Sequence, residues 1–173
     1  MKAILAVAIL TFIAQIQPGR AQSEIHLIPD GYVGWVAIAF RAVNGEGPMY
    51  ERDARLYRIP RNGVLLTQAE PNRGTSPAWK FFFEGADGTR TPIQLVWAGP
   101  VPDTPANRAD PTIGIFGLGR SRAPGGAARC QVDVDMYFIG TKAQLLIQKV
   151  GNRFQRVGQV LATQYVCPQV NGG

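Results

Sequence analysis

The chain contains few of the side chains that bind transition metals or form several disulfides. Its 173 residues include one histidine and two cysteines. This inventory excludes a structural zinc site made of Cys and His ligands, and it excludes a small domain built on many disulfides. We expect no metal ion and no other cofactor.

Several catalytic and nucleotide-binding motifs are also missing. The sequence has no G-x-S-x-G, no H-E-x-x-H and no P-loop pattern. A glycine-rich stretch begins at Gly117, but a dinucleotide-binding G-x-G-x-x-G motif needs glycine where this chain has Arg122. A Cys–His nucleophile is disfavoured because the single histidine, His26, lies far along the chain from both cysteines. We therefore predict no catalytic residues from motifs.

The chain has no block of consecutive basic residues. Its formal net charge is +6, from 18 Lys and Arg against 12 Asp and Glu, and no run of five or more Lys or Arg occurs. Hydrophobic residues make up 46% and charged residues 17%, so the chain can build a core. Scattered positive charge of this size is weak evidence for nucleic acid, and we expect no nucleic-acid partner.

The first 21 residues have the pattern of a secretory signal peptide. Lys2 precedes an apolar run over residues 3–16, and small residues lead to a cleavage site after Ala21. Fourteen apolar residues are too few to span a bilayer, which takes about 20. No later apolar run has membrane length, so we expect no transmembrane segment after cleavage. The expected product is a single β-rich domain over residues 22–173, secreted or periplasmic.

Cys130 and Cys167 are the only candidates for a disulfide. Outside the cytoplasm such a pair usually closes. By the loop-entropy estimate, the bridge would stabilise the fold by up to about 4 kcal/mol. We expect this disulfide.

Short apolar or alternating runs between turn signals predict a mainly β fold. The chain has 20 Gly and 13 Pro, which favour turns. The predicted strands cover residues 25–29, 32–40, 54–59, 64–68, 79–84, 93–97, 112–116, 131–138 and 160–166. About this many strands in one domain predict an antiparallel β-sandwich or a barrel-like fold.

The connections are predicted from turn residues. Asn62-Gly63 and Asp87-Gly88 each predict a hairpin between the flanking strands. Residues 98–111 are expected to form an extended surface loop, and the glycine-rich residues 117–129 an irregular one. Two alternatives stay open for residues 141–160: a short helix near 141–149 capped by Thr141, or a hairpin that turns at Gly151-Asn152.

Three segments resemble a known family. They are residues 27–36 (LIPDGYVGWV), residues 57–67 (YRIPRNGVLLT) and residues 138–141 (FIGT). They are similar to a family of uncharacterised secreted bacterial proteins that open with a LIP-x-GY-x-GWV segment. The resemblance implies a bacterial export product and assigns no activity, cofactor or catalytic residue.

Two small sets of charged residues are candidates for a site. Asp133 and Asp135 are two apart on a predicted strand and therefore share a face, as paired carboxylates in acid–base catalysis do. Their alternation with Val132, Val134 and Met136 also fits a solvent-exposed face. Arg120 and Arg122, on the predicted glycine-rich loop, could bind an anionic sugar, lipid head group or cell-wall polymer.

Aromatic residues are the remaining candidates. Trp35 and Trp79 are possible ligand contacts, although aromatic residues on strands more often serve packing. Taken together, the residues favour an exported, non-catalytic binding or cell-envelope-associated domain, with a protein or a cell-envelope glycan as partner. The alternative is a hydrolase that uses carboxylates such as Asp133 and Asp135 on an envelope or extracellular substrate.

Overall fold

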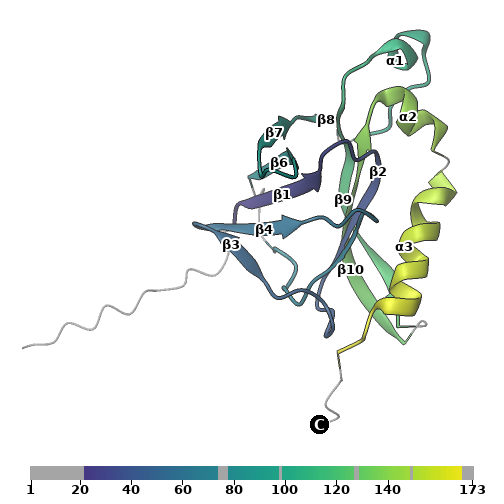
Figure 1. Cartoon of the computed structure of the whole chain (residues 1–173). Coiled ribbons are helices and arrows are strands. Elements are labelled where there is room, and N and C mark those ends of the chain that lie inside the picture. The colour runs from purple at the N-terminus through teal and green to yellow at the C-terminus, as the bar shows by residue number, and fades with distance from the viewer. Residues whose placement is uncertain (1–21, 74–77, 98, 127–128, 149, 169–173) are drawn as a thin grey trace, which may run out of the picture.

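The structure, a computed structural model, describes residues 22–73, 78–97, 99–126, 129–148 and 150–168. The predicted signal peptide over residues 1–21 lies outside the described residues. Most of the described chain forms strands, which gather into two five-stranded sheets. The strands of one sheet run across those of the other (Figure 1). The predicted mainly β fold of the sandwich type is therefore confirmed.

Each sheet draws its strands from distant parts of the chain. Sheet A consists, in spatial order, of β3 (Met49–Glu51), β4 (Ala54–Arg58), β1 (Glu24–Pro29), β6 (Trp79–Glu84) and β7 (Arg90–Ile93). Sheet B consists of β5 (Val64–Leu66), β2 (Gly34–Ala39), β10 (Cys130–Gly140), β9 (Gly114–Gly125) and β8 (Leu95–Trp97).

The sheets are mixed: they contain parallel pairs beside the expected antiparallel ones. β1 is parallel to both β4 and β6, and β2 is parallel to β5. β8 is parallel to β9, whereas β10 is antiparallel to β2 and β9. The reason is that β1 leads directly into β2 of the other sheet, and β4 leads into β5 in the same way. Consecutive strands that change sheets cannot pair as hairpins.

The turn at Asn62-Gly63 is one of these crossings and not the predicted hairpin. The two crossings run side by side: Ile59 N donates to Leu27 O at 2.8 Å, and Ala37 N donates to Gly63 O at 2.8 Å. Gly63 has φ +80°, which glycine adopts without strain. A Cβ atom there would overlap the Tyr32 hydroxyl of the neighbouring crossing.

The hairpin at Asp87-Gly88 is confirmed. β6 and β7 pair antiparallel, and Gly85 N donates to Thr89 O at 2.9 Å across the turn. The return strand, β7, lies earlier in the chain than the predicted 93–97 and shares only Ile93 with it. The chain then passes to sheet B as β8.

Residues 117–125 of the glycine-rich segment belong to a strand, β9 (Gly114–Gly125), so the prediction of an irregular loop was wrong there. β9 pairs with β10 from Gly114↔Gly140 to Cys130↔Gly125, with one irregularity between Met136 and Phe138. Glycine fits in this strand because neighbouring side chains pack closely against the backbone. A Cβ atom on Gly125 would overlap the Val132 side chain and press against Tyr165.

Of the helices in the described chain, one lies where the sequence predicted a helix and two do not. The short helix near 141–149 is confirmed as α2 (Lys142–Ile147), with a capping box between Thr141 and Gln144. Residues 150–164 form α3 (Val150–Gln164), which excludes both the alternative hairpin and the predicted strand over 160–166. The predicted surface loop contains α1 (Pro105–Ala109).

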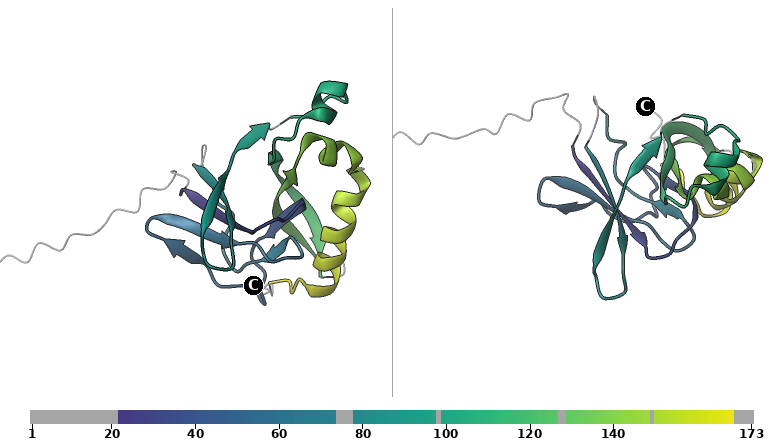
Figure 2. Two further views of the ribbon diagram at one scale, coloured as in Figure 1. Left: turned by 45° about the horizontal axis from the view of Figure 1, so that its top comes forward. Right: turned by 90° about the horizontal axis from the view of Figure 1, so that it is seen from above.

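The two faces of sheet B bury two different clusters. Between the sheets lies an apolar core whose fully buried members include Ile28, Val36, Phe40, Ile115 and Ile139. The other face of sheet B packs against Val157, Leu161 and Tyr165 of α3 and the residue that follows it. α3 lies on the side of sheet B away from sheet A (Figure 2).

Candidate functional site

The alternation of side chains along β10 places the two predicted aspartates on the same face of sheet B. Asp133 and Asp135 face the space between the sheets, on the same face as Tyr137. The two carboxyl residues are 5% and 8% exposed, so the interpretation as a solvent-exposed face was wrong. Arg122 is paired with Asp133 and Arg120 with Asp135 in the β9–β10 register. The strand pairing therefore brings all four predicted charged residues together.

Arg120 is held in place by hydrogen bonds from all three of its guanidinium nitrogens. Its Nε and Nη2 donate to Asp135 Oδ1 and Oδ2, each at 2.7 Å, and its Nη1 donates to Asn72 O at 2.9 Å. The guanidinium also lies 5.8 Å from the centroid of the Phe40 ring. The hydrogen bonds that Arg120 donates to Asp135 raise the pKa of Arg120 above its usual value. This arginine is a fixed positive charge.

Asp133 is surrounded by three further arginines. Arg41 Nη2 donates to Oδ2, and Arg73 Nη2 lies 3.6 Å from the same oxygen. Arg122 Nε donates to Oδ1 at 3.3 Å. The side chain of Asp133 is 7% exposed, whereas those of Arg73 and Arg122 are 68% and 72% exposed. Arg73 and Arg122 can therefore turn toward a ligand without leaving a buried position.

Arg41 reaches Asp133 from an unusual backbone conformation. Its φ is +58°, in the left-handed region that costs a non-glycine residue about 1–3 kcal/mol. The conformation is held by Arg41 N donating to Ala69 O at 3.1 Å and by Ala42 N donating to Thr67 O at 2.9 Å. Its guanidinium also lies 3.8 Å from Glu70. The loop backbone thus directs a cation at the buried carboxylate.

A cavity of about 380 Å³ opens beside these groups. It is lined by Pro71, Arg73, Arg120, Ser121, Arg122 and Asp133. We call it the arginine cavity. Asp135, bound at both oxygens by Arg120, is not among its lining residues. The cavity therefore presents three guanidinium groups and one carboxylate.

A second polar cluster lies deeper between the sheets. His26 Nδ1 is 3.0 Å from the Tyr137 hydroxyl, and His26 Nε2 is 3.4 Å from Glu24 Oε2. Glu24 also accepts from Trp79 Nε1 and from Asn72 Nδ2, both at 2.8 Å. Burial alone would raise the pKa of Glu24, but hydrogen bonding and the charge interaction with His26, helped by these donors, lower it.

Asn72 joins this deeper cluster to the arginine cavity. Its side chain donates to Glu24, and its backbone oxygen accepts from Arg120. Sequence reasoning missed Glu24, although its alternation with apolar residues in Glu24-Ile25-His26-Leu27 places both polar side chains on one face. It also missed Asn72, and nothing in the neighbouring sequence of Asn72 indicates its role.

Arg41 and Arg73 were missed in the same way. Each approaches Asp133 from a loop that is distant from it in sequence. Neither loop carries a local pattern that predicts the contact, because long-range contacts leave no spacing signal in the chain.

The two predicted tryptophan contacts lie in different places. Trp79 binds Glu24 through its indole nitrogen, near the arginine cavity but not lining it. Trp35 packs edge-to-face against Phe138 with ring centroids 5.5 Å apart, and it does not line the cavity either. Trp35 and Trp79 remain predictions as ligand contacts.

The structure joins Cys130 and Cys167 in a disulfide with Cα atoms 6.1 Å apart. The bridge ties the first residue of β10 to the segment that follows α3. Disulfides form and persist in oxidising compartments, so this one indicates an extracytoplasmic location. Within the described chain, no group of three His, Cys, Asp or Glu side chains is placed to hold a metal ion. None of the described helices is long and apolar enough to cross a membrane.

Comparison with known protein families gives a match. Residues 20–110, more than half of its length, match a family of unknown function, DUF6843. The chain belongs to this family. The resemblance to a family of unknown function is thereby confirmed. The match in DUF6843 includes Arg41, Asn72 and Arg73, whereas Arg120 and Asp133 lie beyond it.

One solved structure resembles this DUF6843 member. It is a 2.75 Å crystal structure described as a "Putative Lipoprotein from Bacillus anthracis". The two chains are 13% identical with a TM-score of 0.48, and the match covers 87% of this chain and 83% of the other. A likeness of this size says nothing about function. A search of curated proteins gives no match.

Proposed function

We propose that this protein is an exported, non-catalytic binding domain that recognises an anionic partner through the arginine cavity. One observation carries the proposal. Arg73, Arg120 and Arg122 converge on a cavity whose described lining includes only one carboxylate, Asp133. Guanidinium groups gathered in this way bind carboxylate, sulfate or phosphate groups with charge-assisted hydrogen bonds.

Export is supported by two independent features. The Cys130–Cys167 disulfide suits an oxidising compartment. The first 21 residues have the sequence pattern of a signal peptide. We propose a secreted or periplasmic location on these grounds.

A binding role is favoured over catalysis by the positions of the reactive groups. His26 is 1% exposed and enclosed between the sheets, and both cysteines are in the disulfide. The alternative, a carboxylate-dependent hydrolase, would need two carboxylates at the substrate. Only Asp133 of the predicted pair lines the cavity, since Arg120 occupies both oxygens of Asp135.

The test is binding of dextran sulfate, a polyanion, to the mature, disulfide-bonded protein by biolayer interferometry. We expect Arg73→Gln/Arg122→Gln to weaken binding by about tenfold or more, because two charge-assisted hydrogen bonds are lost. Binding should also weaken as salt rises. The ligand should be recovered with its chain length unchanged.

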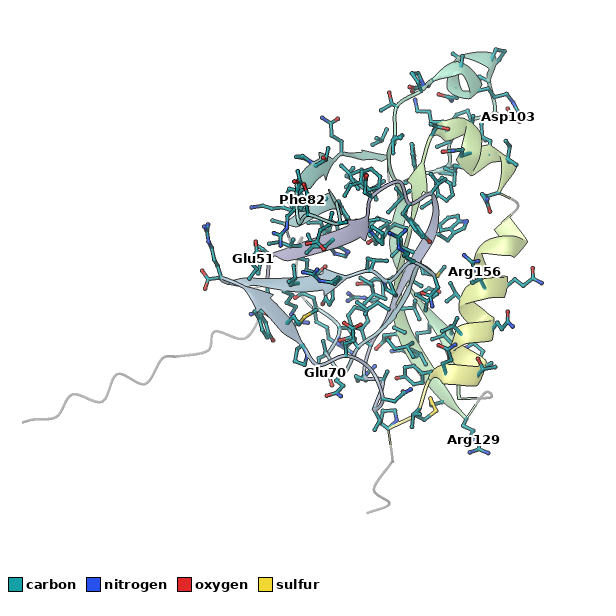
Figure 3. All side chains as sticks on the ribbon, viewed as in Figure 1. Glu51, Glu70, Phe82, Asp103, Arg129 and Arg156 are labelled. Carbon is teal, nitrogen blue, oxygen red and sulfur yellow. A yellow bond between two sulfur atoms is a disulfide. The ribbon has the colours of Figure 1, made fainter. Side chains whose placement is uncertain are left out.

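The matched control is Arg108→Gln/Arg129→Gln, which removes the same charge from exposed positions outside the cavity. Arg108 neighbours Asp103 at the opposite end of the molecule from Glu70, which contacts the site (Figure 3). Equal weakening by the two double variants would mean that net charge alone binds the polyanion, and the cavity would not be the site. Shortening of the ligand would favour the hydrolase.

A further inference from the structure

We infer that the arginine cavity binds an acidic sugar unit of a glycan, through one carboxylate and neighbouring hydroxyl groups. The inference rests on the proposed anion-binding function and names the ligand class of the same site. It depends on three properties of the cavity: its net charge, its mixture of donors and acceptors, and its size.

The net charge of the cavity matches a singly charged ligand. Arg73, Arg120 and Arg122 contribute three positive charges, and Asp133 and Asp135 contribute two negative ones. Arg41 and Glu70 at the margin add one of each sign. A single carboxylate therefore neutralises the site, whereas a phosphate monoester would leave it with excess negative charge against a buried Asp133.

The mixture of donors and acceptors fits a polyhydroxylated ligand. Asp133 is an acceptor at the cavity wall, beside the arginine donors. A simple anion gains nothing from the Asp133 carboxylate and is repelled by it. A sugar acid can place its carboxylate against Arg73 and Arg122 while its hydroxyl groups donate to Asp133.

The size of the cavity also favours a sugar over a small inorganic ion. A volume of about 380 Å³ lies within the range of roughly 300–1,000 Å³ that is usual for organic ligands. At about 30 Å³ per water molecule, it is equivalent to about a dozen waters. One phosphate or acetate ion would leave most of this volume unfilled.

The experiment is isothermal titration calorimetry of the mature, disulfide-bonded protein with galacturonate, glucuronate, galactose, acetate, inorganic phosphate and a tri-glutamate peptide. We expect one of the two uronates to bind at least about tenfold more tightly than acetate or phosphate, with galactose weaker still. Arg122→Gln should weaken the binding of both uronate and acetate, and Arg108→Gln the binding of neither.

Other results separate this inference from the proposed function. If acetate or phosphate binds as tightly as both uronates, the cavity recognises charge alone, so the sugar inference fails and anion binding stands. Tighter binding of the glutamate peptide would identify an acidic peptide as the ligand and overturn the inference. If no anion binds in the calorimeter and the cavity variants bind dextran sulfate as tightly as the wild type does, both proposals fail.

Discussion

At the residue scale, the buried carboxylates are each matched with donors that arrive from elsewhere in the chain. Asp135 is paired with Arg120, and Glu24 accepts from Asn72 and Trp79. An ionised carboxylate can remain between two sheets only with such partners, since burial without them would cost several kcal/mol. The polar residues between the sheets are therefore a connected set, and a change at one affects the others.

The Tyr57 hydroxyl differs from these groups. It is buried and makes no hydrogen bond of good geometry within the described part of the chain, although the Arg55 side chain lies near it. Burial, with the nearby charge of Glu24, raises the pKa of Tyr57 from 10.0 to about 12, and Arg55 partly opposes this rise. The folded state therefore keeps this proton where the unfolded chain loses it. The resulting stability is present below pH 10 and is lost as the pH rises from 10 toward 12.

We predict that Tyr57→Phe raises the free energy of unfolding at pH 7 by about 1 kcal/mol, because it removes an unsatisfied buried hydroxyl. The variant should also lose less stability than the wild type between pH 10 and 12. Urea unfolding at pH 7 and pH 11 measures both effects. Tyr50→Phe, at an exposed tyrosine, is the control. A variant as sensitive to alkali as the wild type would contradict the prediction.

At the element scale, β9 and α3 show why local patterns were insufficient. Glycine is a poor strand former, yet β9 pairs with β10 along nearly its whole length. Gly125 of β9 packs closely against Tyr165 because glycine has no side chain. The apolar residues that α3 and the residue after it pack on sheet B recur every four positions, at Val157, Leu161 and Tyr165. Residues 160–166 also fit a strand pattern, because Val, Thr and Tyr favour strands.

We predict that Leu161→Ala lowers the free energy of unfolding by about 3 kcal/mol, since Leu161 is fully buried between α3 and sheet B. Gln159→Ala is exposed on the same helix and should have little effect. Denaturant unfolding monitored by circular dichroism compares the two. Equal, small effects would show that α3 does not pack on sheet B.

At the scale of the whole molecule, two neighbouring crossings and one disulfide join the parts of the fold. The crossings from β1 to β2 and from β4 to β5 link the two sheets side by side. The Cys130–Cys167 bridge fastens the chain after α3 to the start of β10. The arginine cavity is lined by residues of β9 and β10 together with Pro71 and Arg73 from the chain between β5 and β6, so the site depends on distant parts of the domain.

We predict that the exported protein has the mass of a chain that starts at Gln22. No thiol should react with an alkylating reagent until the disulfide is reduced. Mass spectrometry under non-reducing conditions, with and without alkylation, measures both properties. Loss of the bridge should lower the free energy of unfolding by up to about 4 kcal/mol, from the loop-entropy estimate. Two free thiols on an uncleaved chain would contradict both export and the disulfide.

The sequence by itself determined what depends on local chemistry. Strand-forming runs, the Asp87-Gly88 hairpin, the Thr141 helix cap and the only possible cysteine pair could all be predicted, because neighbouring residues decide them. Tertiary structure alone decided which sheet each strand joins and which arginines surround Asp133. Those outcomes depend on contacts between residues that are far apart in the chain, and such contacts have no fixed spacing in the sequence.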